Sequence, residues 1–330
     1  MAEYEQSGST PDADTSARRL ESFSTLTELV RARATEVAAK DLPIISYSSS
    51  GTSYVDFTPA QVDRLADKAA SYYEAFIHKR TSYDEPVQVL ALLGPSTFAY
   101  FITLLALSRL GHSVLLLSTR LPLTGKDAQR QIPSLLLGIL GTLEDFHCVD
   151  IETGGSETQL DPTRESRHIA YIIHSSGSTS LPRPNYVTHL AAMGNSSSPI
   201  NLVGFVTLPI YHMFGLKCLF RSIMNKKHVY MYNAHLPLSN RYLIDTLSEH
   251  REIQVLYTVS YIVKLMAESI QGTELLAGLI NVIMSGSACA KPIGDKLAHA
   301  GVMLVTHLGS TETGQLMSSV LATGERNGET

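Results

Sequence analysis

The chain has 330 residues, of which 44% are hydrophobic and 17% charged, and its formal net charge is −5. This composition supports one large core or two smaller ones. The slightly acidic balance argues against nucleic acid or an anionic membrane as a partner. No apolar run reaches the roughly 18 residues of a membrane span, and no basic, apolar leader opens the chain. Cys148, Cys218 and Cys289 lack the spacing of a disulfide framework or metal site, so we expect a cytoplasmic protein with reduced thiols.

The hydrophobic pattern then divides the chain into alternating helices and strands. Residues 1–20 are polar and acidic and are predicted to be disordered. A helix is expected after the Thr58-Pro59 cap, a strand at 87–93, a helix from Ser96 to Leu110 and a strand at 114–117. Further helices are predicted near 127–139, 213–224, 240–250, 260–269 and 291–300. Further strands are predicted near 146–151, 169–174, 203–208, 228–232, 254–258, 279–284 and 302–307.

This order of elements predicts the fold class. Strands that alternate with helices of 10–15 residues indicate parallel β-α-β units. Strands that are apolar throughout, such as 114–117 and 302–305, indicate sheets covered on both faces. We therefore expect an α/β fold of two stacked subdomains with mostly parallel sheets. A polar, turn-rich segment near residues 155–168 is predicted to be the seam between them.

The sharpest motif follows the strand predicted at 169–174. It consists of Ser175, Ser176, Gly177, Ser178 and Thr179, with Arg183 a few residues later. Backbone N–H groups and hydroxyls in such a turn can surround phosphate oxygens, glycine permits their close approach, and a guanidinium supplies positive charge. The spacing is not that of a Walker A loop. Composition alone also allows a serine-rich surface loop.

Three further motifs follow predicted strands, at the sheet edge where α/β proteins bind ligands. A carboxylate beside a hydroxyl could hold Mg²⁺, and small residues leave room for a flat ligand. Each motif alone could instead be a packed or capping histidine, a tight turn, or a turn capped by its own Thr and Glu. The motifs are Leu208-Pro209-Ile210-Tyr211-His212-Met213-Phe214-Gly215, Ser285-Gly286-Ser287-Ala288 and Leu308-Gly309-Ser310-Thr311-Glu312-Thr313-Gly314.

Together and in this order, the four motifs resemble those of the adenylate-forming superfamily of acyl-CoA synthetases, luciferases and peptide-synthetase adenylation domains. The serine-rich segment is similar to the phosphate loop of that family, and the segment around His212 to its Leu-Pro-x-x-His-x-x-Gly motif. Residues 285–288 resemble its adenine platform, and residues 308–312 its Tyr-Gly-x-Thr-Glu motif. Residues 89–121 look most like fungal nonribosomal-peptide-synthetase-like carboxylate reductases, where carrier and reductase domains follow the adenylation domain.

The resemblance implies an activity and a set of site residues. A carboxylic acid would be activated with ATP and Mg²⁺ as an acyl-adenylate, in secondary-metabolite biosynthesis, with carrier or reductase domains as partners. Because no Asp follows His212 to bind an amino group, an aryl or other non-amino acid is the expected substrate. By resemblance, the roles fall on Ser175 to Thr179 and Arg183 for the phosphates, Ser287 and Ala288 for adenine, His212 near the substrate carboxylate, Thr311 beside the α-phosphate, and Glu312 for Mg²⁺.

Several features depart from the family pattern. Ser180, Arg183 and Leu308 stand where the family usually has glycine, lysine and an adenine-stacking tyrosine. Residues 21–330 resemble only the large N-terminal portion of an adenylation domain. The ribose-binding Asp, the hinge and the C-terminal subdomain with its catalytic Lys are absent, which predicts a truncated and impaired domain. The alternatives are a protein that does not adenylate, but binds a small acid or a partner or runs a new reaction in the old pocket, and a non-functional remnant.

Overall fold

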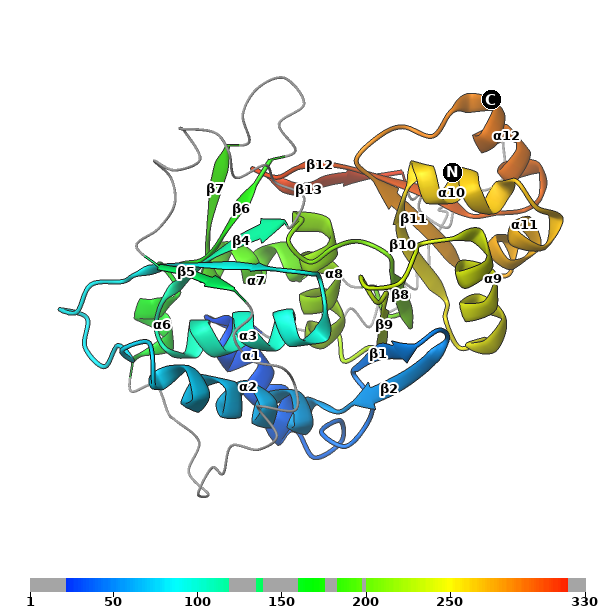
Figure 1. Cartoon of the computed structure of the whole chain (residues 1–330). Coiled ribbons are helices and arrows are strands. Elements are labelled where there is room, and N and C mark those ends of the chain that lie inside the picture. Colours follow the sequence, from blue (N-terminus) through cyan, green and yellow to red (C-terminus); the bar gives the residue numbers. More distant parts are fainter. Residues whose placement is uncertain (1–21, 119–134, 139–159, 176–182, 198–199, 320–330) are drawn as a thin grey trace, which may run out of the picture.

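A computed structural model describes residues 22–118, 135–138, 160–175, 183–197 and 200–319. Two sheets lie side by side, with helices between and around them (Figure 1). The predicted disordered N-terminus, residues 127–134 of the helix predicted near 127–139, and the strand predicted at 146–151 lie outside the described residues. So do four of the predicted site residues, which are Ser176, Gly177, Ser178 and Thr179.

The helices are α1 (Leu26–Thr35), α2 (Pro59–Glu74), α3 (Phe98–Arg109), α6 (Pro162–Glu165), α7 (His189–Ser196), α8 (Met213–Met224), α9 (Asn240–Glu249), α10 (Ser260–Ala267), α11 (Ile270–Ala277) and α12 (Lys291–His299). The strands are β1 (Ile45–Ser50), β2 (Ser53–Phe57), β3 (Val89–Gly94), β4 (Ser113–Ser118), β5 (Leu135–Gly138), β6 (Ile169–His174), β7 (Pro184–Thr188), β8 (Gly204–Val206), β9 (Val229–Met231), β10 (Val255–Val259), β11 (Asn281–Ser285), β12 (Leu304–Ser310) and β13 (Gly314–Ser318).

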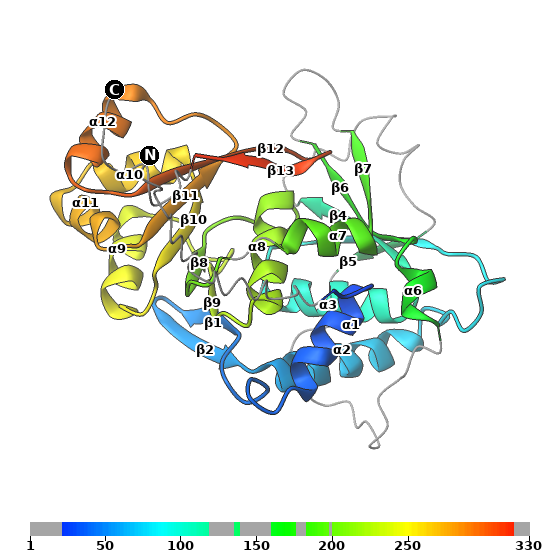
Figure 2. The same cartoon turned by 180° about the vertical axis from the view of Figure 1, so that it is seen from behind.

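The first sheet has five strands in the order β5-β3-β4-β6-β7, and only the last pair is antiparallel. Strands β3 and β4 are buried on both faces. Leu90 and Leu116 point into the main core with α1, α2 and α3, which lie together on one side of the sheet (Figure 2). The alternating residues Ala91 and Leu115 form a smaller cluster on the other face. This two-sided burial explains why β3 and β4 have continuous apolar sequences.

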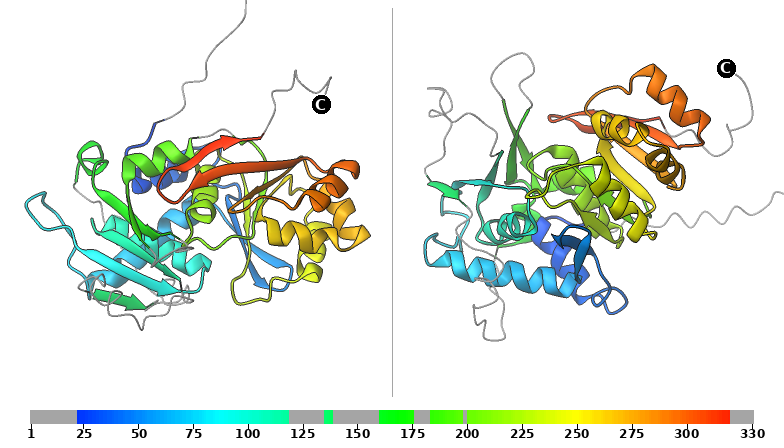
Figure 3. Two further views of the ribbon diagram at one scale, coloured as in Figure 1. Left: turned by 90° about the horizontal axis from the view of Figure 1, so that it is seen from above. Right: turned by 45° about the vertical axis from the view of Figure 1, so that its right-hand side comes forward.

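The second sheet has eight strands in the order β13-β12-β11-β10-β8-β9-β1-β2. It is parallel from β12 to β1, with an antiparallel pair at each edge. Helices α9 to α12 cover one face, where Phe205 and Leu256 are buried. The other face, with Val206 and Tyr257, joins the main core against α8. Helix α8 therefore lies between the two sheets (Figures 1 and 3).

The predicted α/β fold with two mostly parallel sheets is confirmed, but several details differ. Residues 135–138, predicted to end a helix, form strand β5. The predicted seam near 155–168 is followed by β6 and β7, which still belong to the first sheet. Strands β1 and β2 already belong to the second sheet, and the chain returns to that sheet between α7 and β8. Helix α3 is capped by Thr97 rather than Ser96, whose hydroxyl instead accepts a hydrogen bond from the Ile210 N–H at 2.8 Å. In the described part of the chain, no helix is both long and apolar enough to cross a bilayer.

Candidate functional site

The four motifs meet at one cavity of about 760 Å³ between the two sheets. A cavity of this volume is in the usual range for small-molecule sites. Its wall includes Ser175, Arg183, His212, Thr311 and Glu312, which come from both sheets and from the start of α8. Motifs that are up to 137 residues apart in the sequence therefore share one surface, as predicted from their positions after strands.

Ser175 and Arg183 form the base of the serine-rich segment. The Ser175 N–H donates to the Arg183 carbonyl at 3.0 Å, and the Arg183 N–H donates to the Ser175 hydroxyl at 3.1 Å. These bonds continue the antiparallel pairing of β6 with β7, in which His174 is opposite Pro184. Ser175 and Arg183 are thus held together at the cavity.

The acidic motif is the turn of the hairpin formed by β12 and β13. Ser310 is opposite Gly314, which has a positive φ of 66°, and the Ser310 and Thr313 hydroxyls are 3.0 Å apart. Thr311 and Glu312 therefore occupy the tip of the turn. The Asn185 side chain of β7 donates a hydrogen bond to the Thr311 carbonyl, so the turn is tied to the other sheet (Figure 3).

Glu312 presents an ionised carboxylate at the cavity. A hydrogen bond from the Ser310 side chain, with a smaller contribution from the Arg183 charge, lowers the pKa of Glu312 below its ordinary value. No group of three or more potential ligands for a metal ion exists among the described His, Cys, Asp and Glu side chains. A lone carboxylate suits Mg²⁺, which keeps several waters and shares its remaining positions with phosphate oxygens.

His212 occupies the N-cap position of α8, with extended backbone angles of φ −107° and ψ 142°, but its side chain makes no capping hydrogen bond to the helix. The imidazole lines the cavity and its ring centroid lies 5.0 Å from that of Tyr211.

The glycine of the His212 motif has a steric role. A Cβ atom at Gly215 would collide with the carbonyl oxygens of Pro209 and Leu208. We expect Gly215→Ala to lower the free energy of unfolding by about 1–3 kcal/mol, measured by urea denaturation. The control is Gly294→Ala in α12, where an added Cβ meets nothing within 4 Å and should stabilise the helix by up to about 1 kcal/mol. Equal effects of the two changes would contradict this explanation of the motif.

The segment predicted to bind adenine is placed differently in part. Ser285 and Gly286, at the end of β11, line the cavity, and Gly286 has a positive φ of 92°. Ser287 and Ala288 are exposed and are not among the described residues of the cavity wall. The Ser287 hydroxyl is instead hydrogen-bonded to that of Ser260. The turn thus brings its first two residues, rather than its last two, to the site.

Comparison with known proteins agrees with this geometry. The model of the family described as AMP-binding enzyme matches residues 31–329. The chain belongs to the AMP-binding enzyme family. The predicted resemblance to adenylate-forming enzymes is therefore confirmed.

Members of this AMP-binding family that resemble the chain are much longer. It is 31% identical to the adenylate-forming reductase stbB of Stachybotrys bisbyi over 45% of this chain and 15% of the reductase. It is 29% identical to an adenylate-forming reductase of Aspergillus terreus over 69% of this chain and 25% of the reductase. The N-terminal domain of FACL13 from Mycobacterium tuberculosis shares the fold, with a TM-score of 0.66 and 19% identity over 86% of this chain and 75% of that domain.

Sequence reasoning missed part of the wall of the cavity between the two sheets. Lys217 of α8, His307 of β12 and Gln315 of β13 also line it. The sequence carried one signal for the missed residues: Lys217 and Arg221 are four residues apart in a helix that is otherwise mostly apolar. That spacing places both on one side of the helix.

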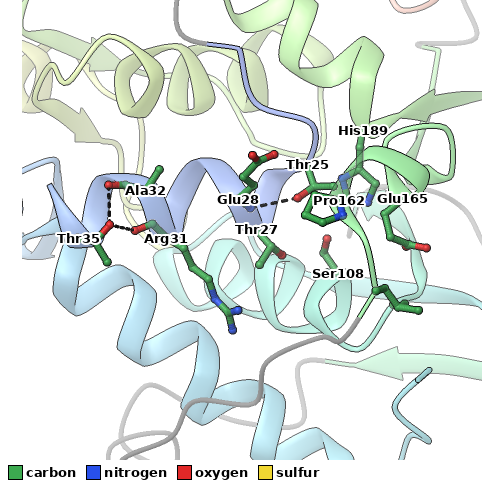
Figure 4. Close-up of a pocket in the computed structure, with 12 residues that line it drawn as sticks. Thr25, Thr27, Glu28, Arg31, Ala32, Thr35, Ser108, Pro162, Glu165 and His189 are labelled. Atoms are coloured by element: carbon green, nitrogen blue, oxygen red, sulfur yellow. Dashed lines mark hydrogen bonds between the residues drawn. The ribbon is translucent and has the colours of Figure 1, made fainter. Parts of the chain in front are cut away.

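A second cavity of about 340 Å³ lies beside α1, away from the motifs (Figure 4). Several of its polar groups are satisfied within the fold, although the Ser108 hydroxyl has no partner among the described residues. The Thr25 hydroxyl accepts from the Glu28 N–H at 3.1 Å, and His189 Nδ1 accepts from the Leu26 N–H at 3.3 Å. Burial lowers the pKa of His189 to about 4, which keeps it neutral. We interpret this space as part of the packing of α1, and the cavity between the two sheets as the candidate functional site.

Proposed function

We propose that this chain binds ATP and a carboxylic acid between its two sheets and forms an acyl-adenylate with release of pyrophosphate. The observation that carries the proposal is the convergence of Ser175, Arg183 and Glu312 on one cavity wall. The family model and its ATP-using members support the choice of nucleotide. An oxygen of the carboxylate would attack the α-phosphorus, and the bond between the α- and β-phosphates would break.

The residues contribute charge and position. The Arg183 guanidinium can offset phosphate charge, and the backbone and hydroxyl of Ser175 hold the start of the phosphate-binding segment. Glu312 would hold Mg²⁺, which would neutralise phosphate charge when bound. His212 and Thr311 lie on the same wall, where they can orient the attacking carboxylate and the α-phosphate. Catalysis of this kind rests on positioning and electrostatic stabilisation.

The chemistry of the wall supports a non-amino acid as substrate. A substrate amino group needs a carboxylate partner, and Glu312 is the only acidic residue among the described residues that line the cavity. The reductases that resemble the chain support carrier or reductase domains as acceptors of the acyl group. An aryl acid and a role in secondary metabolism are part of the same proposal and rest on the resemblance of the sequence to such enzymes.

The test is calorimetric titration of the purified chain with MgATP. Wild type should bind, and Glu312→Gln and Arg183→Met should each weaken binding by about tenfold or more, because each removes a charge-assisted contact. Glu274→Gln, which changes an exposed glutamate of α11, is the matched control and should bind as wild type. Acid-dependent release of pyrophosphate, measured with a panel of aryl and aliphatic acids, tests the proposed formation of an acyl-adenylate. A folded chain that binds no MgATP would overturn the proposal and favour a protein that does not adenylate.

A further inference from the structure

Three basic side chains lie together at the inner wall of the cavity, and we name Lys217, Arg221 and His307 the basic cluster. Their exposed fractions are 5%, 1% and 5%. Lys217 and His307 line the cavity itself, and Arg221 lies behind Gln315, whose side-chain oxygen accepts a hydrogen bond from Arg221 Nη2 at 2.7 Å. The charged side chains of Arg221 and Lys217 are thus almost fully removed from water beside a cavity large enough for a ligand.

The hydrogen-bonding capacity of the basic cluster is not used up. Arg221 Nε and Nη1 are buried, and neither has a hydrogen-bond partner among the described residues. The same holds for His307 Nδ1 within the described part of the chain. Buried donors without partners are rare because each loses its bonds to water. These atoms have almost no exposed surface, so a ligand in the cavity would contact the cluster through Lys217 and His307, which line the cavity, and Arg221 would act on it as a nearby charge.

The cluster also lacks a counter-charge in the described structure. Arg80 and Arg109, which like Arg221 are only 1% exposed, pair with Glu165 at 2.8 Å and Asp67 at 2.6 Å. Arg221 forms no ion pair with any described carboxylate. This chain therefore neutralises its other buried guanidinium groups but leaves that of Arg221, beside the cavity, without an anion.

The remaining acidic neighbours are neutral. Burial raises the pKa of the Cys218 thiol to about 12 and also raises that of the Tyr257 phenol, so neither supplies negative charge at neutral pH. Burial, with Arg221 next to it, lowers the pKa of Lys217 to about 8, which leaves it mostly protonated. Burial and the two neighbouring cations lower the pKa of His307 to about 4. The cluster thus carries about two positive charges and a neutral imidazole that can donate or accept a hydrogen bond.

We propose that the basic cluster binds a second anionic group of the substrate, so that the acid is a dicarboxylate or an equivalent dianion. This inference rests on the proposed adenylation, because one carboxylate must remain for activation. The two anionic groups of the substrate would bind at different places along α8. Lys217 and Arg221 lie five and nine residues beyond His212, which is about 7 Å and 13 Å along an α-helix. A cavity of about 760 Å³ holds an acid that reaches from the phosphate-binding wall to the cluster.

The experiment compares each diacid with its own neutral-ended analogue. The probes are malonate, succinate, glutarate, isophthalate and terephthalate, each beside its monoamide, titrated calorimetrically into the full chain with and without AMP. At least one diacid should bind wild type about tenfold or more tightly than its monoamide, since the cluster makes charge-assisted bonds to the second carboxylate. Lys217→Met should reduce that preference to about twofold or less. Lys264→Met, which removes the charge of an exposed lysine of α10, should leave it unchanged.

Three outcomes would overturn the inference. They are a wild type that prefers no diacid over its monoamide, a Lys217→Met variant that keeps the preference, and a Lys217→Met variant whose MgATP affinity falls as much as that of Glu312→Gln. The third outcome would mean that the basic cluster binds the nucleotide rather than the acid. MgATP binding is measured separately, so wild-type binding of MgATP without a diacid preference overturns this inference alone, whereas loss of MgATP binding tells against the adenylation itself.

Discussion

Replacing Arg109 by methionine should lower the free energy of unfolding by about 3–5 kcal/mol, because the half-buried Asp63 loses its ion-pair partner and the buried Asp67 loses the closer of its two partners. Arg109 is 1% exposed and joins the end of α3 to α2, with Nη1 2.6 Å from Asp67 Oδ1 and 2.8 Å from the Asp63 carbonyl. Its Nη2 also pairs with the Asp63 carboxylate. Urea denaturation monitored by circular dichroism measures the loss.

The matched control for this change is Arg241→Met. The Arg241 side chain is 91% exposed and lies 3.5 Å from Asp245, so its loss should change stability by less than about 0.5 kcal/mol. A triple variant with Asp63→Asn, Asp67→Asn and Arg109→Met should recover much of the stability, because it removes the uncompensated charges together. If the triple variant is no more stable than Arg109→Met, packing rather than charge explains the loss.

Several buried elements of this fold could be predicted because the spacing of their apolar residues matches a helix or a buried strand. The helix predicted at 213–224 is α8, and the strand predicted at 169–174 is β6, with the same bounds. The sequence analysis missed α1 and β1, although both contribute to the main core, and it missed elements with little core contact. Strand β13 is an edge strand whose Leu316 and Met317 are each 62% exposed, so its sequence has no buried face to reveal it. Strand β7 is also at a sheet edge and begins at Pro184.

The sequence indicated which segments form the site, but not the hydrogen bonds and turns that arrange them. Strand ends mark the edge of a parallel sheet, so the positions of Ser175, His212 and Glu312 after strands were informative. The hydrogen bond from Asn185 to the Thr311 carbonyl joins residues 126 positions apart on different sheets, and no local pattern encodes it. The choice of Gly286 over Ala288 for the cavity wall depends on how the chain turns after β11, which a run of small residues leaves open.

The same site is expected to destabilise the protein at neutral pH. Lys217 and Arg221 are buried next to each other, and a buried charge that lacks a counter-ion costs stability. We therefore expect Lys217→Met, which keeps most of the side-chain length and removes the charge, to be more stable than wild type at pH 7 in the absence of acid. Function at this cavity would then be maintained against stability, as is common where a ligand completes a charged site.

The pKa of Lys217 predicts how the free energy of unfolding changes with pH, and over which pH range. Burial lowers the pKa of Lys217 from 10.5 to about 8, so between about pH 8 and 10.5 the unfolded chain holds a proton that the folded chain has lost. Stability that depends on Lys217 should therefore rise with pH across this window, by a total of about 3 kcal/mol. Urea denaturation at pH 7 and pH 10 should show the advantage of Lys217→Met over wild type shrinking. The exposed-site control Lys264→Met should differ from wild type by the same small amount at both pH values.

A bound diacid should reverse this behaviour, because an anion beside Lys217 favours its charged form and raises its pKa. At pH 7, a saturating diacid should therefore stabilise wild type more than Lys217→Met, and this difference should fall as the pH rises above about 8, where free Lys217 loses its proton. A difference between wild type and Lys217→Met that stays constant from pH 7 to pH 10, with and without diacid, would mean that Lys217 keeps its ordinary pKa. In that case the lysine reaches water in the folded protein, and its charge would not lower the free energy of unfolding.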